Sequence, residues 1–161
     1  MEKLPFTMLS IKNFLFNPVL LACISSWFSA QFIKTVVNII YGRIHSFSEL
    51  FETLIWKTGG LPSSHSSLVT CLCTCVGFRN GPDSDVFLVA LVFFLVTIRD
   101  AVGVRRSNGI QAKKLNEIGK KRDENKILEY SPIKEVNGHS PMEVIIGIVL
   151  GFFIGIAFSV L

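Results

Sequence analysis

A histidine and a glutamate four residues apart form the first pair that could do chemistry. His139 and Glu143 stand just before a long apolar run, and Pro141 between them suits the first turn of a helix. Residues four apart on a helix share a face, so the Glu143 carboxylate can reach the imidazole of His139. A carboxylate on one ring nitrogen fixes the tautomer and makes the other nitrogen a better nucleophile or base. The pair suits nucleophilic chemistry, although such pairs are also common as structural contacts.

A second histidine follows a loop that is rich in glycine and serine. Residues 59–67 read Gly-Gly-Leu-Pro-Ser-Ser-His-Ser-Ser and precede another apolar run. Pro62 suits a first helical turn and Ser63 or Ser64 suits an N-cap, so the pattern predicts the start of a helix. Free N–H groups at such a start can hold a phosphate, and His65 can carry a proton near neutral pH. The alternative is a capped loop with a surface histidine, because turns of this composition are common.

Charged residues inside apolar runs are a third signal, because they are costly there unless they find a partner or water. Lys34 and Gln31 lie about one helical turn apart in the first apolar run, and we expect Lys34 to face a polar pocket. The alternative is that the Lys34 side chain extends to the membrane surface. Arg99 and Asp100 close the third run, where they either satisfy each other or another helix, or form a wall of the pocket.

The elements that must position these groups are membrane helices. The chain has 161 residues and is 50% hydrophobic, which is too apolar for an ordinary soluble domain of this size. We expect one all-α integral membrane domain, a bundle with about four spans, at residues 18–40, 63–78, 85–104 and 141–161. The second span is short for a bilayer core of about 30 Å. It would then begin below the membrane surface, which would place the loop before His65 inside the protein.

The polar parts of the chain indicate its orientation. Four spans place both chain ends on one side of the membrane and the loops 41–62 and 105–140 on the other. These loops carry most of the lysines and arginines, which places them in the cytoplasm. The net charge of +4 fits this topology and anionic lipid head groups, so we expect no nucleic-acid partner.

Shorter features lie between the spans. Residues 44–56 have the apolar spacing of an amphipathic helix on the membrane surface or against the bundle. Within the loop 105–140, Ala112, Leu115 and Ile118 indicate a short surface helix, followed by a solvated segment. The four cysteines lie in apolar runs with poor geometry for one metal ion, so we expect no metal site.

Several motifs, in order, resemble one family. Residues 62–65 resemble the Pro-Ser-x-His motif of type 2 phosphatidic acid phosphatases and vanadium haloperoxidases. Residues 139–147 resemble the last motif of that superfamily, His-x-x-x-Asp-Val-x-x-Gly. A small divergent branch of bacterial and plant membrane proteins is similar over nearly the whole chain. The stretches that match it are residues 30–34, 59–66, 100–106, 109–112 and 138–144.

The resemblance implies a helical bundle with this family's core, and phosphoester hydrolysis through a phosphohistidine without a metal or cofactor. By the same resemblance, His139 attacks phosphorus and Glu143 orients it. His65 protonates the leaving alcohol, while Ser63 and Ser64 hold the phosphate oxygens together with main-chain N–H groups.

Two cationic positions depart from the phosphatase pattern. The Lys-x6-Arg-Pro motif is absent, and the arginine expected six residues before the nucleophile falls on Ile133. Such cations neutralise the charge on a transferring phosphoryl group. The available substitutes are Lys34, Arg105 and Arg106, and the resemblance adds Gln31, Gly60 and Asp100 as supporting residues.

The leading hypothesis is a phosphatase for a lipid phosphate, with its active site on the cytoplasmic face of a bacterial cytoplasmic membrane. Membrane embedding favours a phosphate carried by a lipid over a soluble ester. One alternative is a non-catalytic membrane protein that binds anionic head groups with the same cations. Another is a small transporter, for which four spans would require association, so a homo-oligomer stays open.

Overall fold

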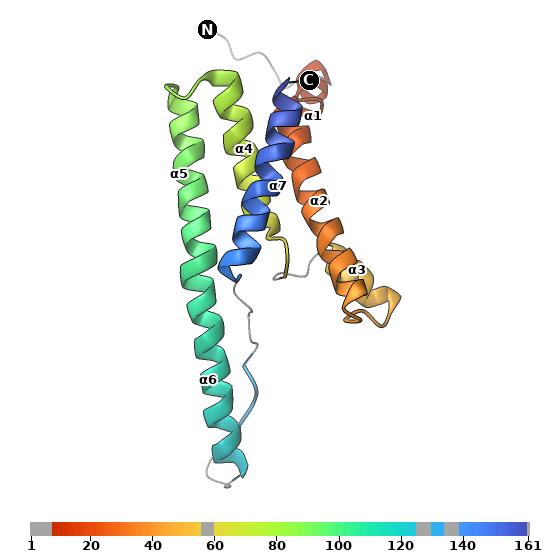
Figure 1. The fold of residues 1–161 in the computed structure, drawn as a ribbon, viewed down its shortest axis with the longest axis vertical. Helices are drawn as coiled ribbons and strands as arrows, with labels where there is room; N and C mark the ends of the chain where they lie inside the picture. The colour runs from red at the N-terminus through yellow and green to blue at the C-terminus, as the bar shows by residue number, and fades with distance from the viewer. Residues whose placement is uncertain (1–7, 56–59, 125–129, 134–138, 161) are drawn as a thin grey trace.

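The computed structural model describes residues 8–55, 60–124, 130–133 and 139–160, and within them every regular element is a helix. The expected all-α fold is confirmed. Gly59 and Gly138 of the motifs, Leu161 of the last expected span and parts of the two polar loops lie outside the described residues. Figure 1 shows α1 (Met8–Leu15) and the end of α7 (Pro141–Val160) at one end of a helical bundle, and α3 (Phe47–Ile55) toward the other.

Helix α4 (Ser64–Asn80) is the central element, because it packs against α2 (Pro18–Ile40), α5 (Asp85–Arg99) and α7. Figure 1 shows α4 between these helices. Its buried side chains are small, and the hydroxyls of Ser67 on α4 and Ser26 on α2 are 2.7 Å apart. Small and hydroxylated residues let membrane helices approach closely where lipid gives no hydrophobic drive for association.

Three glycines bring α7 into main-chain contact with α4. A Cβ atom built on Gly151 would lie 2.1 Å from the main-chain oxygen of Ser67, and one on Gly147 would lie 2.5 Å from that of Ser63. One built on Gly155 would lie 2.7 Å from the Cβ of Thr74. The spacing of four residues is the small-xxx-small pattern of packed membrane helices, a signal that our sequence analysis did not use.

Within the part of the chain that the structure describes, three helices are long and apolar enough to cross a membrane, by length and composition: α2, residues Asp85–Arg122 and α7. Helix α4 corresponds to the expected second span and has 17 residues. At about 1.5 Å per residue it is about 25 Å long, shorter than a bilayer core of about 30 Å, as the sequence predicts. Its central position lets its polar first turn lie inside the protein, where irregular main chain is tolerated.

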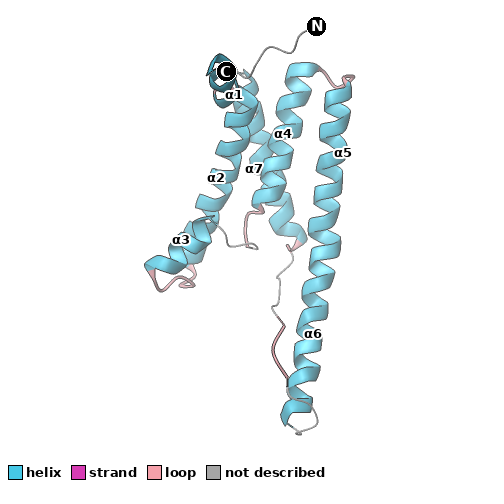
Figure 2. Cartoon of the chain, turned by 180° about the vertical axis from the view of Figure 1, so that it is seen from behind, coloured by secondary structure: helices cyan, strands magenta, loops and turns pink. Residues whose placement is uncertain are grey.

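The third expected span is the first part of a longer helix. A π-helical turn, η1 (Asp100–Val104), follows α5 and leads directly into α6 (Arg105–Glu124). We expected a span ending at residue 104 and only a short surface helix after it. Most residues of α6 are good helix formers, so the change from apolar to charged side chains does not end the helix. Figure 2 shows α6 reaching well beyond the bundle.

The amphipathic helix expected at residues 44–56 is α3, which begins at Phe47 and ends at Ile55. Thr53 is buried, whereas Phe47 and Phe51 are exposed. Exposed aromatic side chains on a short amphipathic helix suit contact with a membrane surface.

Candidate active site

Helix α4 begins at Ser64, with Ser63 as its N-cap. The main-chain N–H of Ser66 donates to the Ser63 hydroxyl oxygen over 3.4 Å, and the Ser66 hydroxyl donates to the same atom over 2.9 Å. Ser63 as N-cap agrees with the sequence pattern, but the expectation that Pro62 lies in the first helical turn is wrong. Because the cap is Ser63, Pro62 precedes the helix and follows Leu61 through a cis peptide bond. Gly60 has a positive φ of 91°, a conformation that favours glycine.

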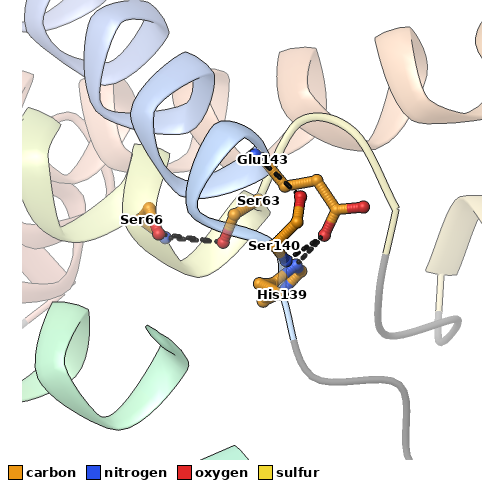
Figure 3. A network of polar contacts seen from close by, with 5 residues as sticks. All are labelled: Ser63, Ser66, His139, Ser140 and Glu143. Atoms are coloured by element: carbon orange, nitrogen blue, oxygen red, sulfur yellow. Dashed lines mark hydrogen bonds and ion pairs between the residues drawn. The ribbon is translucent and has the colours of Figure 1, made fainter. Parts of the chain in front are cut away.

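The expected contact between His139 and Glu143 is present at the start of α7. Nδ1 of His139 lies 3.1 Å from Oε2 of Glu143, and His139 is buried. Figure 3 shows this pair beside Ser140. Because a carboxylate only accepts hydrogen bonds, Nδ1 carries the proton and Nε2 keeps its lone pair. That is the arrangement a nucleophilic imidazole needs.

Glu143 also closes a capping box, which our sequence analysis missed. Its Oε2 accepts from the main-chain N–H of Ser140 over 3.0 Å, and its own N–H donates to the Ser140 hydroxyl over 3.3 Å. The signal was the spacing of serine and glutamate three residues apart before an apolar run. The capping box fixes the Glu143 carboxylate at the start of α7. The group that holds the His139 ring is therefore itself held in place.

One hydrogen bond joins the two histidine-bearing segments. The main-chain N–H of Ser63 donates to the main-chain oxygen of Glu143 over 3.0 Å. Together with the close approach of Gly147 to Ser63, it ties the first turn of α7 to the N-cap of α4.

His65 and His139 line one small cavity of about 30 Å³, together with Thr97, Asp100, Ala101 and Arg105. Nε of Arg105 lies 2.5 Å from Oδ2 of Asp100. The π-helical turn makes this pairing possible, because the Arg105 N–H donates to the Asp100 carbonyl and brings residues five apart over each other. Single π turns occur often at functional sites.

Lys34 enters the same neighbourhood from α2. It is buried, and a Cβ atom on Gly60 would lie 3.7 Å from its Cγ. Its charge is close enough to interact with Glu143, His139 and His65. Lys34 is buried, but it is not among the residues that line the cavity with Asp100 and Arg105, so the expectation that it faces this polar pocket stays a prediction. Gln31 is also buried, and its Oε1 has no hydrogen-bond partner among the described residues.

Some expected residues are not brought to the cavity. Arg106 is exposed and is not among the cavity-lining residues. The Ser63 hydroxyl is fully buried in the cap of α4, and Ser64 is buried outside the cavity lining. Their roles in holding phosphate stay predictions. Thr97 and Ala101 are lining residues that sequence reasoning missed; helical spacing around Asp100 was the available signal.

Ile133, at the expected arginine position, is bound to α6. Its N–H donates to Oδ1 of Asn116 over 3.0 Å, and Nδ2 of Asn116 donates to its carbonyl over 2.9 Å. The Tyr130 hydroxyl also donates to Asn116, and a Cβ atom on Gly119 would overlap the Tyr130 ring. Residues 130–133 are thus fixed to α6, and position 133 is not among the residues that line the cavity.

Burial lowers the pKa of His139 below the ordinary histidine value. The hydrogen bond and charge of Glu143 oppose this effect, while Lys34 and Arg105 lower the pKa further. The neutral imidazole is therefore the dominant form near neutral pH, and it keeps the lone pair on Nε2.

Comparison with known proteins agrees with these features. Residues 15–154 match a family model described as the divergent PAP2 family. The chain is 36% identical over 149 residues to the "Uncharacterized membrane protein YuiD" of Bacillus subtilis (strain 168), and the match covers 86% of this chain and 91% of that protein. No solved structure matches the chain. The matched motifs and the apolar helices identify the chain as a membrane protein that belongs to the divergent PAP2 family.

Proposed function

We propose that the protein is a phosphatase that removes phosphate from a membrane lipid without a metal ion, through a phosphohistidine on His139. The observation that carries the proposal is the placing of His139 and His65 on one cavity beside Arg105. These histidines come from segments far apart in the sequence. Phosphoryl transfer needs a nucleophile and an acid on opposite sides of phosphorus, and two histidines meet that need.

The contacts of each residue suggest its role in the reaction. Glu143 holds the Nδ1 proton of His139, so Nε2 attacks phosphorus and displaces the alkoxide. His65, which has no carboxylate one turn away, donates its proton to the leaving oxygen. Water then attacks the phosphohistidine, which releases inorganic phosphate and returns His139. Arg105 and Lys34 offset the negative charge that develops on the transferring group.

The ion pair of Arg105 with Asp100 favours a second candidate function. A cation already paired with a carboxylate offers less charge to a phosphoryl group, and the cavity of about 30 Å³ is small. Both features weigh against rapid phosphoryl transfer, so the second candidate is a protein that binds an anionic head group with the same cations and does not hydrolyse it.

Phosphate release separates the two functions. Purified protein in nanodiscs is assayed against a panel of lipid phosphates, with His139→Ala and His65→Ala as test variants. His45→Ala is the matched control, because His45 is exposed in the turn before α3. We expect release from wild type and His45→Ala and none from His139→Ala. Head-group binding without release in wild type would support the second function.

The same proposal includes the orientation. The basic helix α6 and the start of α7 face the cytoplasm, in keeping with the positive-inside rule. A single cysteine at position 120, on the exposed side of α6, is placed in a cysteine-free background. It should resist a membrane-impermeant maleimide in intact cells and react after lysis. Labelling in intact cells would show that α6 lies outside the cytoplasm and would contradict the proposed orientation.

A further inference from the structure

The walls of the polar cavity belong to two parts of the molecule. His65 and His139 lie at the starts of α4 and α7, which the hydrogen bond from Ser63 to Glu143 joins. The opposite wall comes from α5, η1 and the first residue of α6, which together form one continuous helix. Its lining residues are Thr97, Asp100, Ala101 and Arg105. We call this helix, residues 85–124, the arm, and Figure 1 shows it beside α4.

The cavity is too small for the group that it is proposed to hold. Its volume is about 30 Å³. One water molecule needs at least about 10–15 Å³ of such space, so the cavity has room for about two waters. A phosphate has a phosphorus and four oxygen atoms, and in a lipid phosphate a chain is attached to one of these oxygens. The two walls must therefore move apart before such a group can bind.

The arm packs lightly against the rest of the bundle. Ala90 is the one buried residue of α5, a helix that the structure describes completely. Among the described residues α5 packs against α4, whereas a cavity of about 600 Å³ is lined by both Phe87 of α5 and Phe152 of α7. Segments with few buried contacts are the ones that move at low cost in free energy.

The contacts that hold the arm lie at its start, away from the polar cavity. The ring of Phe87 lies against Gly77 of α4, where a Cβ atom would be 2.9 Å from a ring carbon. Gly81, in the turn between α4 and α5, has a positive φ of 84°, a conformation that favours glycine. Thr97 lies about 15 Å along the helix from Phe87, so a rotation of about 15° at Phe87 would move Thr97 by about 4 Å.

We propose that the arm is a gate for the phosphate site and rotates about Phe87 and the turn at Gly81. The rotation carries Asp100 and Arg105 away from the two histidines, admits the ligand, and returns Arg105 beside the bound phosphate. Residues 130–133, which are bonded to α6, move with the arm. The inference rests on the proposed function for the identity of the ligand. The small cavity is then the closed form of the site, and its volume does not count against hydrolysis.

Distances between pairs of spin labels test the movement without hydrolysis. Labels are placed on the full protein in nanodiscs, in a cysteine-free background, at the exposed positions Val104 of η1 and Met142 of α7. The control pair is Phe78 and Val86, exposed positions on either side of the turn at the start of the arm. In the free protein we expect a broader distance distribution for the first pair than for the control. A phosphonate analogue of a lipid phosphate should shift the first pair to longer distances and leave the control unchanged.

The outcomes separate the gate from the proposed function. Distributions of equal width for the two pairs, with no shift on addition of the phosphonate, would overturn the gate. Phosphate release from a lipid together with such fixed distances would keep the phosphatase and reject the gate. A moving arm in a protein that releases phosphate from no lipid would keep the gate and reject the hydrolysis.

Phe87 provides a second test of the same movement. Phe87→Ala removes the ring that meets Gly77, so the long-distance population of the Val104–Met142 pair should rise severalfold. Gly77→Ala places a methyl group against that ring and should have the same effect. Phe153→Ala, at an exposed position of α7, is the matched control and should leave the distribution unchanged. Wild-type distributions in both Phe87→Ala and Gly77→Ala would overturn the rotation about Phe87.

Discussion

The main-chain N–H of Ser63 donates to the main-chain oxygen of Glu143 over 3.0 Å, and this bond sets the relation between the two histidines. His65 lies two residues after Ser63, and His139 lies four residues before Glu143. Main-chain atoms therefore hold both segments in place. The side chains of His65 and His139 extend only a short distance from them to line one cavity. The precision of the site depends on how closely α4 and α7 approach.

The first prediction concerns that approach. Gly151→Ala places a methyl group against the main-chain oxygen of Ser67, where a Cβ atom would lie 2.1 Å away. Main chain cannot rotate away like a side chain, so α7 must shift. We expect a loss of about 1–3 kcal/mol of stability and a lower Tm in detergent. Gly103→Ala is the control, because a Cβ atom there meets nothing within 4 Å. Equal Tm values for both variants would contradict the close packing.

The second prediction concerns pH. Because the pKa of His139 lies below the ordinary histidine value, kcat/KM should lose activity on the acid side only below about pH 6.5. Glu143→Gln removes the charge that raises this pKa, so the acid limb should move to still lower pH while the plateau falls. Glu117→Gln, on exposed α6, is the control. A limb that moves to higher pH in Glu143→Gln would exclude His139 as the group titrating there.

Much of the site could be predicted from the sequence. The spacing of His139 and Glu143 gives a contact within one helix, and the serines before α4 give its cap, because both depend on local chain geometry. Lys34 could be predicted to face inward because an unpaired charge is costly in lipid. Such signals do not depend on how the helices pack.

The missing parts depend on packing or on main-chain detail. The pairing of Asp100 with Arg105 needs a π turn, and no apolar spacing marks one. Ile133 could be placed outside the cavity only after its bonds to Asn116 were known. The sequence analysis missed the continuation of α5 into α6 because it took the change from apolar to polar residues as the end of the helix. The residues of α6 nevertheless keep a high helix propensity.

The third prediction concerns Lys34. Lys34→Met keeps most of the side-chain length and removes the charge. We expect a lower rate of lipid phosphate hydrolysis with no loss of Tm, because a buried charge costs desolvation. Lys12→Met on α1 is the matched control, since Lys12 is exposed. Full activity in Lys34→Met would remove Lys34 from the site, and a lower Tm would assign it a structural role.

The fourth prediction concerns Asp100. The side chains of Arg105 and Asp100 are 49% and 38% exposed, so their ion pair should add about 1 kcal/mol or less to stability. Asp100→Asn removes a negative charge from the place where a phosphate would bind. The inhibition constant of inorganic vanadate should therefore fall. Arg105→Gln should raise it, and a rise in both variants would show that Asp100 is needed to position Arg105.

The most direct test of the mechanism is the covalent intermediate on His139. Wild-type protein is mixed with a lipid phosphate labelled in its phosphate, denatured within the first turnover under conditions that preserve phosphohistidine, and digested for mass spectrometry. The proposed mechanism predicts phosphate on His139, more of it in His65→Ala with an aryl phosphate if His65 also assists the water step, and none in His139→Ala. An active enzyme that carries no phosphate on His139 and keeps its turnover in His139→Ala would contradict the mechanism.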